Sequence, residues 1–448
     1  MNPLPETACP SAGQPNSRAL PAVAGSRLSR RNWLSRSAGL VLGTGLGLGF
    51  GPSPFGLLSG LSLRSAGAAE FDPQALAQIK IRMQRFVDDR TVAGMVVLVG
   101  SKAGISLLQP LGQQSLTPAV PMQPKTLFRI ASMTKPITAL GAMRLAEEGR
   151  LKVTDPVEKY LPEFKGQMLV ADRKDGQITL KKPSRPITIR DLLTHTSGMP
   201  GSYPEGLADM YHLRGMSLAE AVAVCSQRPL EFEPGSRWAY CNTGIDTLGR
   251  VIEVVSKTPF EQYLQQIVFE PLGMKDTAFY PSAEQWQRVA TLYDQKDGQL
   301  QVTARPLIGP TDKARHPIPA GGLFSTAVDL ARLYQAFLRG GELDGQRLVS
   351  PETLAEMTKV QTGDLTCGFV PGMSFGYGFA VVNQPQGVTG MLSRGTYGHG
   401  GAFGTQAWID PQQDLFVVLL IQRNGLPNAD GSEIRSELQT AAVAALKK

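Results

Sequence analysis

The first periodic run of hydrophobic residues in the folded part of the chain predicts an amphipathic helix followed by two strands. Over residues 72–89 the apolar side chains recur at spacings of three and four, which is typical of one buried helix face. These apolar side chains belong to Leu76, Ile79, Met83 and Phe86. Residues 94–101 and 104–110 then read as two strands, with a turn at Lys102-Ala103 between them. We therefore expect a helix and then a β-hairpin.

A second helical pattern begins next to a serine and a lysine. The apolar residues of the segment 137–146 recur with the helical period, and Gly149 ends the pattern. Ser132 and Lys135 come just before this run. The pattern therefore predicts that Ser132 lies at a helix N-terminus and that Lys135 follows one turn later on the same face.

The remaining patterns place helices in the middle of the chain and strands near both ends. Helices are predicted for residues 154–162, 220–226, 243–256, 259–269, 326–340 and 432–446, and strands for residues 377–382, from 397, 406–409 and 415–422. A hairpin is predicted over 170–180, and a strand, a short helix and a turn over 187–200. The predicted fold is an α+β sandwich, in which an antiparallel sheet from both chain ends is flanked by helices and carries an inserted, mostly helical region.

The first 68 residues have the features of an export leader and not of a folded domain. Residues 29–34 (Ser-Arg-Arg-Asn-Trp-Leu) resemble a twin-arginine signature, a Gly- and Leu-rich apolar stretch follows, and residues 66–68 form an A-x-A-like cleavage site. An uncleaved membrane anchor is the alternative, but many glycines together with Pro52 and Pro54 make a poor spanning helix. We therefore divide the chain into a leader, 1–68, and a domain, 69–448, with its sheet part at about 69–125 and 370–448 and its helical part at about 126–369.

The charge of the chain is concentrated in this leader. The 448 residues carry a formal charge of +7, but the leader alone holds six arginines and one glutamate, so the domain carries only +2. A nearly neutral domain without a basic stripe gives little support to nucleic-acid binding. We expect export to the periplasm or beyond, with membrane attachment only through an uncleaved leader.

Cysteine and histidine are too sparse for a disulfide framework or a recognisable metal site. Cys9 lies in the leader, and Cys225, Cys241 and Cys367 leave at most one bridge open in the domain. The four histidines have no metal-ligand spacing, and there is no H-E-x-x-H motif. We therefore expect neither a metal nor a cofactor.

Ser132 and Lys135 form the only S-x-x-K motif in the sequence. A serine hydroxyl becomes a good nucleophile only when a base removes its proton, and a buried lysine with a lowered pKa can be that base. The dipole of a helix start favours negative charge developing on the serine. Taken alone, the motif is more often an ordinary helix cap followed by a solvated lysine.

Two further motifs follow in the chain and favour a catalytic role for Ser132 and Lys135 over an ordinary helix cap. Tyr240-Cys241-Asn242 is the only Y-x-N, and His399-Gly400-Gly401 begins a predicted strand. In this order, the three motifs resemble those of the serine β-lactamase and penicillin-binding-protein superfamily, with class C β-lactamases and family VIII carboxylesterases most similar. Longer matching phrases cover residues 127–136, 187–200, 232–244, 271–274, 320–330 and 375–379.

This resemblance implies a role for each motif residue. Ser132 would be the nucleophile that forms an acyl-enzyme, and Lys135 would ease the removal of its proton. Tyr240 would act as the general base, as a phenolate or through Lys135, and a nearby cation would lower the pKa of its phenol. Asn242 would orient Lys135 and the acyl group, and the backbone N–H groups of Ser132 and Ala402 would form the oxyanion hole. Whether lysine or tyrosine is the base stays open.

His399 is the departure from the family pattern. Class C β-lactamases have Lys-Thr-Gly at this place, where the lysine helps to hold the carboxylate of the drug. A histidine is mostly neutral at pH 7, so His399 should bind a carboxylate more weakly, while Gly400 and Gly401 keep the strand open to substrate. The alternative is that His399 only makes a structural hydrogen bond.

The resemblance therefore implies a serine hydrolase for small acyl esters or amides. The second hypothesis is a β-lactamase, a D-alanyl-D-alanine carboxypeptidase or a D-aminopeptidase, acting on β-lactams or peptidoglycan peptides. The third is a non-catalytic sensor or scaffold.

Three other residues attract attention and are given smaller roles. Ser374 lies in the only G-x-S-x-G, but the expected strand after it does not fit the strand–turn–helix of a nucleophile elbow. His195 is expected to brace the site by hydrogen bonding and not to join a catalytic triad. Cys241 is expected to pack and not to react.

Overall fold

The computed structural model describes residues 68–204, 215–304, 306–309, 314 and 316–447. The predicted export leader lies outside these ranges, apart from its last residue. No helix within the described ranges is long and apolar enough to cross a membrane.

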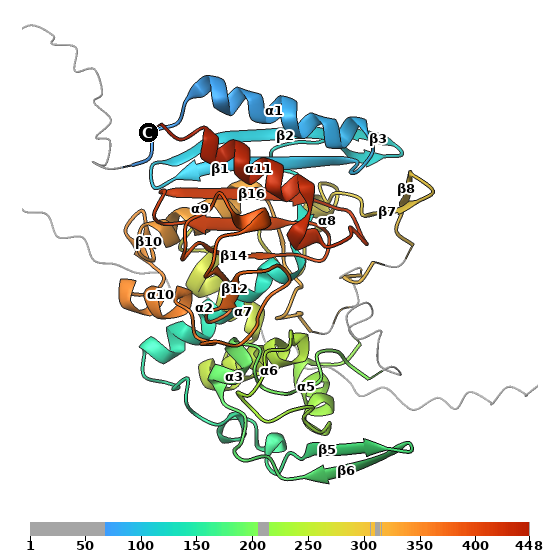
Figure 1. The fold of residues 1–448 in the computed structure, drawn as a ribbon, viewed down its shortest axis with the longest axis vertical. Helices are drawn as coiled ribbons and strands as arrows, with labels where there is room; N and C mark the ends of the chain where they lie inside the picture. Colours follow the sequence, from blue (N-terminus) through green and yellow to red (C-terminus); the bar gives the residue numbers. More distant parts are fainter. Residues whose placement is uncertain (1–67, 205–214, 305, 310–313, 315, 448) are drawn as a thin grey trace, which may run out of the picture. The chain divides into compact units, whose positions relative to one another are not determined.

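Strands from both ends of the folded chain form one eight-stranded antiparallel sheet (Figure 1), in the order β12-β13-β14-β15-β16-β1-β2-β3. The strands are β1 Gly94–Ser101, β2 Gly104–Leu116, β3 Ala119–Pro121, β12 Met373–Phe375, β13 Ala380–Val382, β14 Tyr397–Gly400, β15 Gln406–Asp410 and β16 Leu415–Ile421. The two chain ends meet in the sheet where β1 pairs with β16, for example Val97 opposite Leu419.

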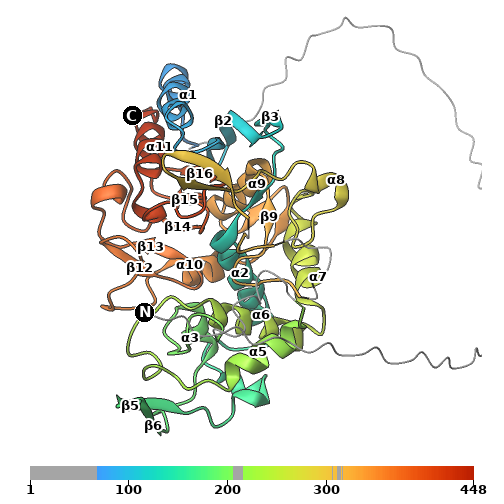
Figure 2. The same ribbon diagram turned by 90° about the vertical axis from the view of Figure 1, so that its right-hand side faces the viewer.

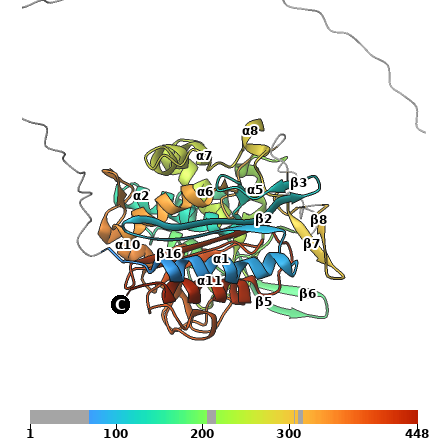
Figure 3. The same cartoon turned by 90° about the horizontal axis from the view of Figure 1, so that it is seen from above.

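Alternate side chains of the central strands pack into two different cores, as the strand period of two requires. On β1, Val97 points into the core under helices α1 Pro73–Asp88 and α11 Glu433–Ala444, which lie side by side over one face of the sheet (Figure 3). Val96 and Leu98 point into the larger core on the opposite face. Every residue of β1 is buried, because both faces of the sheet are covered.

The opposite face carries the mostly helical region (Figure 2). Its helices are η1 Ala131–Met133, α2 Thr134–Glu147, η2 Val157–Lys159, η3 Pro162–Phe164, α3 Ile189–Leu193, α5 Leu218–Ser226, α6 Asn242–Ser256, α7 Phe260–Leu264, η5 Gln265–Phe269, α8 Ala283–Trp286, α9 Ala327–Leu338 and α10 Pro351–Thr358. Its short strand pairs are β4 Phe128–Arg129 with β9 Phe324–Ser325, β5 Leu169–Lys174 with β6 Gln177–Lys181, β7 Tyr293–Lys296 with β8 Gln299–Val302, and β10 Glu342–Leu343 with β11 Gln346–Arg347.

The predicted fold class is confirmed, and local side-chain chemistry explains many of the boundaries. Helix α9 begins after Thr326, whose hydroxyl accepts a hydrogen bond from the N–H of Asp329. The helix ends before Gly340 and Gly341, which have positive φ angles of 77° and 95°. On α1, the four predicted apolar residues are the four buried ones.

Two local predictions were wrong, and one hairpin was missed. Residues 187–189 form no strand, and only a single bridge joins Thr188 to Pro156. The strand predicted for 377–382 begins at Ala380, because Gly378 turns the chain with a φ of 77° after the short strand β12. The β7–β8 hairpin was not predicted, although its Asp297-Gly298 turn, with two positive φ angles, is a hairpin signal.

Candidate active site

Ser132 lies in the tight turn that leads into helix α2. The structure places it in the 3₁₀ turn η1, and the α-helix itself begins two residues later, at Thr134. Ala131, just before the serine, adopts a φ of 46°, which is uncommon for a residue with a side chain and is often found at functional sites. This turn holds Ser132 at the start of a helix whose residue Lys135 is completely buried.

Lys135 brings three separate segments together at one nitrogen. Its Nζ lies 3.0 Å from Ser132 Oγ, 2.8 Å from Asn242 Oδ1 and 2.7 Å from the carbonyl oxygen of Ala320. Burial is the largest cause that lowers the pKa of Lys135, to about 7, while the negative charge of Asp246 acts in the opposite direction. Both the ammonium and the neutral amine are therefore accessible near neutral pH.

The hydrogen-bond partners of Lys135 Nζ determine where the lone pair of the neutral amine points. A neutral amine has two N–H donors and one lone pair, and the Asn242 and Ala320 oxygens can only accept hydrogen bonds. The third partner, the Ser132 hydroxyl, is the one that can donate a proton. The lone pair of neutral Lys135 therefore faces Ser132 Oγ, which is the geometry of a general base next to a nucleophile.

Tyr240 lies beside Ser132 and Lys135, but the pKa of its phenol is raised and not lowered as the sequence analysis expected. The Lys135 Nζ lies 4.6 Å from the centroid of the Tyr240 ring. Burial raises the pKa of Tyr240 far above its ordinary value, and a hydrogen bond with Ser132 only partly offsets this. The expected lowering of the phenol pKa by a nearby cation is thus wrong, because loss of hydration dominates, and Tyr240 stays a neutral phenol.

A second layer, which the sequence analysis missed, holds the partners of Lys135 in place. Asn242 begins helix α6, and Asp246, one turn later, is buried and accepts a hydrogen bond from the N–H of Ala320 at 2.9 Å. The carbonyl of the same Ala320 receives Lys135. The four-residue spacing from Asn242 to Asp246 on a helix was the signal that could have identified it.

A cavity of about 150 Å³ opens beside Ser132. It is lined by Ala131, Ser132, Tyr240, Asn242, Leu307, Ile308, Ile318, Ala320, Gly321 and Ala402. Three of these side chains are polar and uncharged, and the others are apolar or glycine. The aliphatic wall of Leu307, Ile308 and Ile318 was not predicted, because nothing in its local sequence ties it to the motifs.

The backbone of Ala402 reaches the same cavity from the end of strand β14. Within the described part of the chain, its N–H donates to no protein acceptor. Gly401, one residue earlier, packs so tightly that an added Cβ would overlap Thr405 Oγ1 and the Ile130 carbonyl. Beyond Gly398, strand β13 no longer pairs with β14, so His399 and Gly400 have no partner in β13, and both residues are buried.

His399 is buried next to Tyr240, and its side chain is not among those that line the cavity beside Ser132. Its Nδ1 lies 2.6 Å from the Gly400 carbonyl, so Nδ1 carries the proton and Nε2 is an acceptor. Burial, aided by the charge of Lys135, lowers the pKa of His399 to about 3. His399 is therefore neutral at physiological pH and offers no positive charge to a substrate carboxylate.

His195 holds the backbone of the Y-x-N motif. Its Nδ1 accepts a hydrogen bond from the N–H of Cys241 at 3.2 Å, and its ring lies 4.7 Å from the ring of Tyr240. Burial lowers the pKa of His195 well below its ordinary value, and the nearby charge of Lys135 adds to this effect. The neutral ring fits the bracing interaction that we expected.

Cys241 and Ser374 occupy structural positions. Cys241 is buried and caps helix α6, with its Sγ accepting from the N–H of Gly244 at 3.2 Å. Ser374 is buried in the middle of strand β12, opposite Val381, without the strand–turn–helix of a nucleophile elbow. Cys225, Cys241 and Cys367 are all free and buried.

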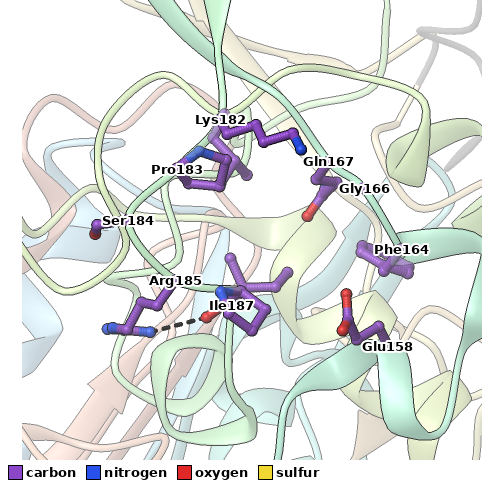
Figure 4. A pocket seen from close by; sticks show the side chains of 11 residues that line it. Glu158, Phe164, Gly166, Gln167, Lys182, Pro183, Ser184, Arg185 and Ile187 are labelled. Carbon is purple, nitrogen blue, oxygen red and sulfur yellow. Dashed lines mark hydrogen bonds between the residues drawn. The ribbon is translucent and has the colours of Figure 1, made fainter.

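A larger cavity of about 300 Å³ lies elsewhere, beside the segment that joins β6 to α3, and Figure 4 shows its lining. It is lined by Glu158, Phe164, Gly166, Gln167, Lys182, Pro183, Ser184, Arg185, Pro186, Ile187 and Leu230. The hydroxyl of Ser184 is bound to Glu233 at 3.0 Å, and no predicted site residue lies there. Among the described residues there is also no cluster of three or more His, Cys, Asp or Glu side chains suited to a metal ion.

Comparison with known proteins identifies the family of this chain. The sequence model of the family described as "Beta-lactamase" matches residues 80–442, most of the chain. The chain belongs to the beta-lactamase family. The predicted resemblance to this superfamily is therefore confirmed over residues 80–442.

Proteins similar to this chain include an esterase, a putative carboxypeptidase and a hydrolase of known structure. Esterase EstB of Burkholderia gladioli is 32% identical over 392 residues, which are 79% of this chain and 94% of the esterase. A putative D-alanyl-D-alanine carboxypeptidase of Salmonella agona is 31% identical over 68% of this chain and 71% of its own length. The solved structure of EstCE1, a hydrolase with promiscuous acyltransferase activity, matches with a TM-score of 0.71 and 27% identity over 83% of this chain and 99% of EstCE1.

Proposed function

We propose that this protein cleaves small, uncharged acyl esters through an acyl-enzyme formed on Ser132. The chain is a serine hydrolase of the beta-lactamase family, and the proposal concerns its substrate and the roles of its residues. The observation that carries it is the lining of the Ser132 cavity, which presents three neutral polar side chains and no charged one. A neutral ester loses little hydration on entering such a site, whereas a carboxylate would lose much without gaining a cationic partner.

In the proposed acylation step, neutral Lys135 takes the proton of Ser132 while Oγ attacks the ester carbonyl. The carbonyl oxygen becomes an oxyanion, which the N–H groups of Ser132 and Ala402 stabilise. The C–O bond to the alcohol then breaks, and the proton passes from Lys135, directly or through the neutral phenol of Tyr240, to the leaving oxygen. The products of this step are the free alcohol and the Ser132 ester.

In the proposed deacylation step, a water molecule attacks the acyl carbonyl on the same face. Lys135, again neutral, accepts the proton of the water, with Tyr240 as a relay. The proton returns to Ser132 Oγ when the acid leaves. The aliphatic wall of Leu307, Ile308 and Ile318 fits a short apolar acyl group, since a cavity of about 150 Å³ has roughly the volume of five waters.

The alternative substrates are β-lactams and peptidoglycan peptides ending in D-alanine, which fits the name of the Salmonella relative. Both substrates carry a carboxylate near the scissile bond. The neutral His399, with a pKa of about 3, supports the ester over them. Amides without a carboxylate stay within the proposal.

We further propose that the protein acts outside the cytoplasm. The twin-arginine-like residues 29–34, the apolar stretch after them and the cleavage-like residues 66–68 support export. Edman sequencing of the secreted protein, with an N-terminus near residue 69, would test both export and cleavage. An intact leader on a membrane-bound protein would contradict cleavage.

The decisive experiment compares Ser132→Ala with Ser374→Ala on p-nitrophenyl butanoate and on a chromogenic cephalosporin. The Ser132 variant should lose turnover and labelling by a fluorophosphonate probe, and the Ser374 variant should keep both. The wild-type protein should cleave the ester far faster than the cephalosporin. Retained activity in Ser132→Ala, or faster cephalosporin cleavage, would contradict the proposal.

A further inference from the structure

The carboxylate of Asp430 lies against the strand that borders the active site. Asp430 lies in the turn η7 Ala429–Gly431, and its Oδ1 accepts a hydrogen bond from Gln406 Nε2 at 3.1 Å. This places the carboxylate directly over Gly400, where an added Cβ would overlap Asp430 Oδ1. Gly400 is two residues from Ala402, which lines the Ser132 cavity.

The cationic partner of Asp430 lies on its buried side. Arg435 Nη1 is 3.9 Å from Asp430 Oδ1, and the Arg435 side chain is only 1% exposed and stacks on Trp408. The Asp430 side chain is 24% exposed. Solvent and any bound molecule therefore meet the negative end of this ion pair, and the positive end lies inside the protein.

The field of Asp430 reaches the reacting groups. Its charge is among the causes that raise the pKa of Tyr240, whose side chain lines the cavity. Among the ionisable groups already described at the Ser132 site, only Lys135 can carry the opposite charge. Lys135 is buried and already bound to three oxygens, Asp246 is negative, and His399 is neutral.

We propose that Asp430 is a specificity-determining residue, which excludes esters that carry a carboxylate and favours neutral and cationic ones. This inference rests on the proposed ester hydrolysis by Ser132 and adds to it a reason for the substrate preference. An anionic substrate that approaches the Ser132 cavity from the side of Asp430 meets a partly exposed carboxylate, whose cationic partner Arg435 is buried. A quaternary ammonium group at the same place meets an attractive charge.

The expected size of the effect follows from the distance and the screening. A unit charge in a partly exposed cleft, some residues away from the bond that reacts, changes the rate by about three- to tenfold per substrate charge. The effect should decrease as salt shortens the screening length from about 10 Å at 0.1 M to about 3 Å at 1 M.

The test measures kcat/KM for three p-nitrophenyl esters of similar length: butanoate, the succinate monoester and 4-(trimethylammonio)butanoate. Asp430→Asn keeps the shape of the side chain and an oxygen for Gln406 while it removes the charge. We expect this variant to lower the neutral-to-anionic rate ratio about three- to tenfold and to lower the cationic-to-neutral ratio by a similar factor. Asp344→Asn, which also breaks an arginine–aspartate pair but in the β10–β11 turn, should leave both ratios unchanged.

A second measurement needs no variant. In the wild-type protein, both ratios should move towards one as salt is raised from about 0.1 M to about 1 M, and uncatalysed hydrolysis is subtracted throughout. Ratios that are unchanged in Asp430→Asn, or insensitive to salt in the wild type, would overturn the role of Asp430. Loss of butanoate cleavage in Ser132→Ala would still support the proposed function, so the two failures can be told apart.

Discussion

The Lys135 nitrogen lies over the ring of Tyr240, 4.6 Å from its centroid. In this position the ammonium interacts with the π face of the ring, an arrangement that favours the cation but does not require an ionised phenol. Loss of hydration then keeps the phenol protonated, and burial also lowers the pKa of Lys135 to about 7. Burial therefore favours Lys135 over Tyr240 as the general base, and it leaves Tyr240 protonated, so that its hydroxyl can relay a proton.

The first prediction concerns the base. Lys135→Arg keeps a positive charge but cannot supply a neutral form, because an arginine is not deprotonated in this pH range. Ester turnover should fall about 10²-fold or more, in line with the usual size of general-base catalysis. The measurement is single-turnover acylation with p-nitrophenyl butanoate, and circular dichroism checks the fold. Near-normal acylation in this variant would exclude Lys135 as the base.

The pH dependence follows from the same assignment. Activity requires the unprotonated Lys135, whose pKa is about 7, so kcat/KM should rise with pH and level off above roughly pH 8. Below pH 6 it should fall about tenfold per pH unit. A profile that is flat from pH 5 to 8 would contradict a lysine base with this pKa.

The second prediction separates the tyrosine from the lysine. Tyr240→Phe keeps the ring under Lys135 but removes the hydroxyl that relays the proton. An alkyl ester, whose leaving alcohol needs a proton, should lose about 10² to 10⁴ in kcat. A p-nitrophenyl ester, whose leaving group departs as an anion, should lose less in the acylation step. Equal losses for both esters would argue against a role in protonating the leaving group.

The third prediction uses Asp246, whose negative charge raises the pKa of Lys135. Asp246→Asn removes that charge while its amide oxygen can still accept from the N–H of Ala320. Because the opposing charge is lost, the pKa of Lys135 should fall, and the acidic limb of the kcat/KM profile should move to lower pH. The profile of Asp344→Asn is the matched control. A shift of the acidic limb to higher pH would contradict the inference that the charge of Asp246 raises the pKa of Lys135.

The fourth prediction concerns stability. His195 has a φ of 59° and accepts from the buried N–H of Cys241. His195→Ala leaves that N–H without a partner, at about 1–3 kcal/mol, and puts alanine in a left-handed conformation that histidine and asparagine adopt more readily. Asparagine tolerates this conformation and can supply an oxygen acceptor. In urea unfolding, the alanine variant should therefore lose more stability than the asparagine variant, and the reverse order would contradict the bracing role.

The periodic signals of the sequence were sufficient for the large elements. The i, i+3 and i+4 pattern of α1 gave its buried face, and the helix predicted from residue 326 begins at the residue that caps α9, Thr326. These signals act over one or two turns, so they do not depend on the rest of the fold. The errors at 187–189 and at 377–379 occurred where a short segment takes its conformation from distant neighbours.

The motif residues were identifiable for the same local reason, because their order and spacing are fixed along the chain. The sequence by itself determined the fold class, the family and the residues Ser132, Lys135, Tyr240 and Asn242 as candidates. Only the tertiary structure shows that the pKa of Lys135 is lowered and that of Tyr240 is raised, because a pKa depends on burial and on charges brought from other segments. The tertiary structure also places Leu307 in the wall of the cavity and the carboxylate of Asp430 beside Gly400. Only folding can bring side chains from such distant segments next to the same cavity and strand.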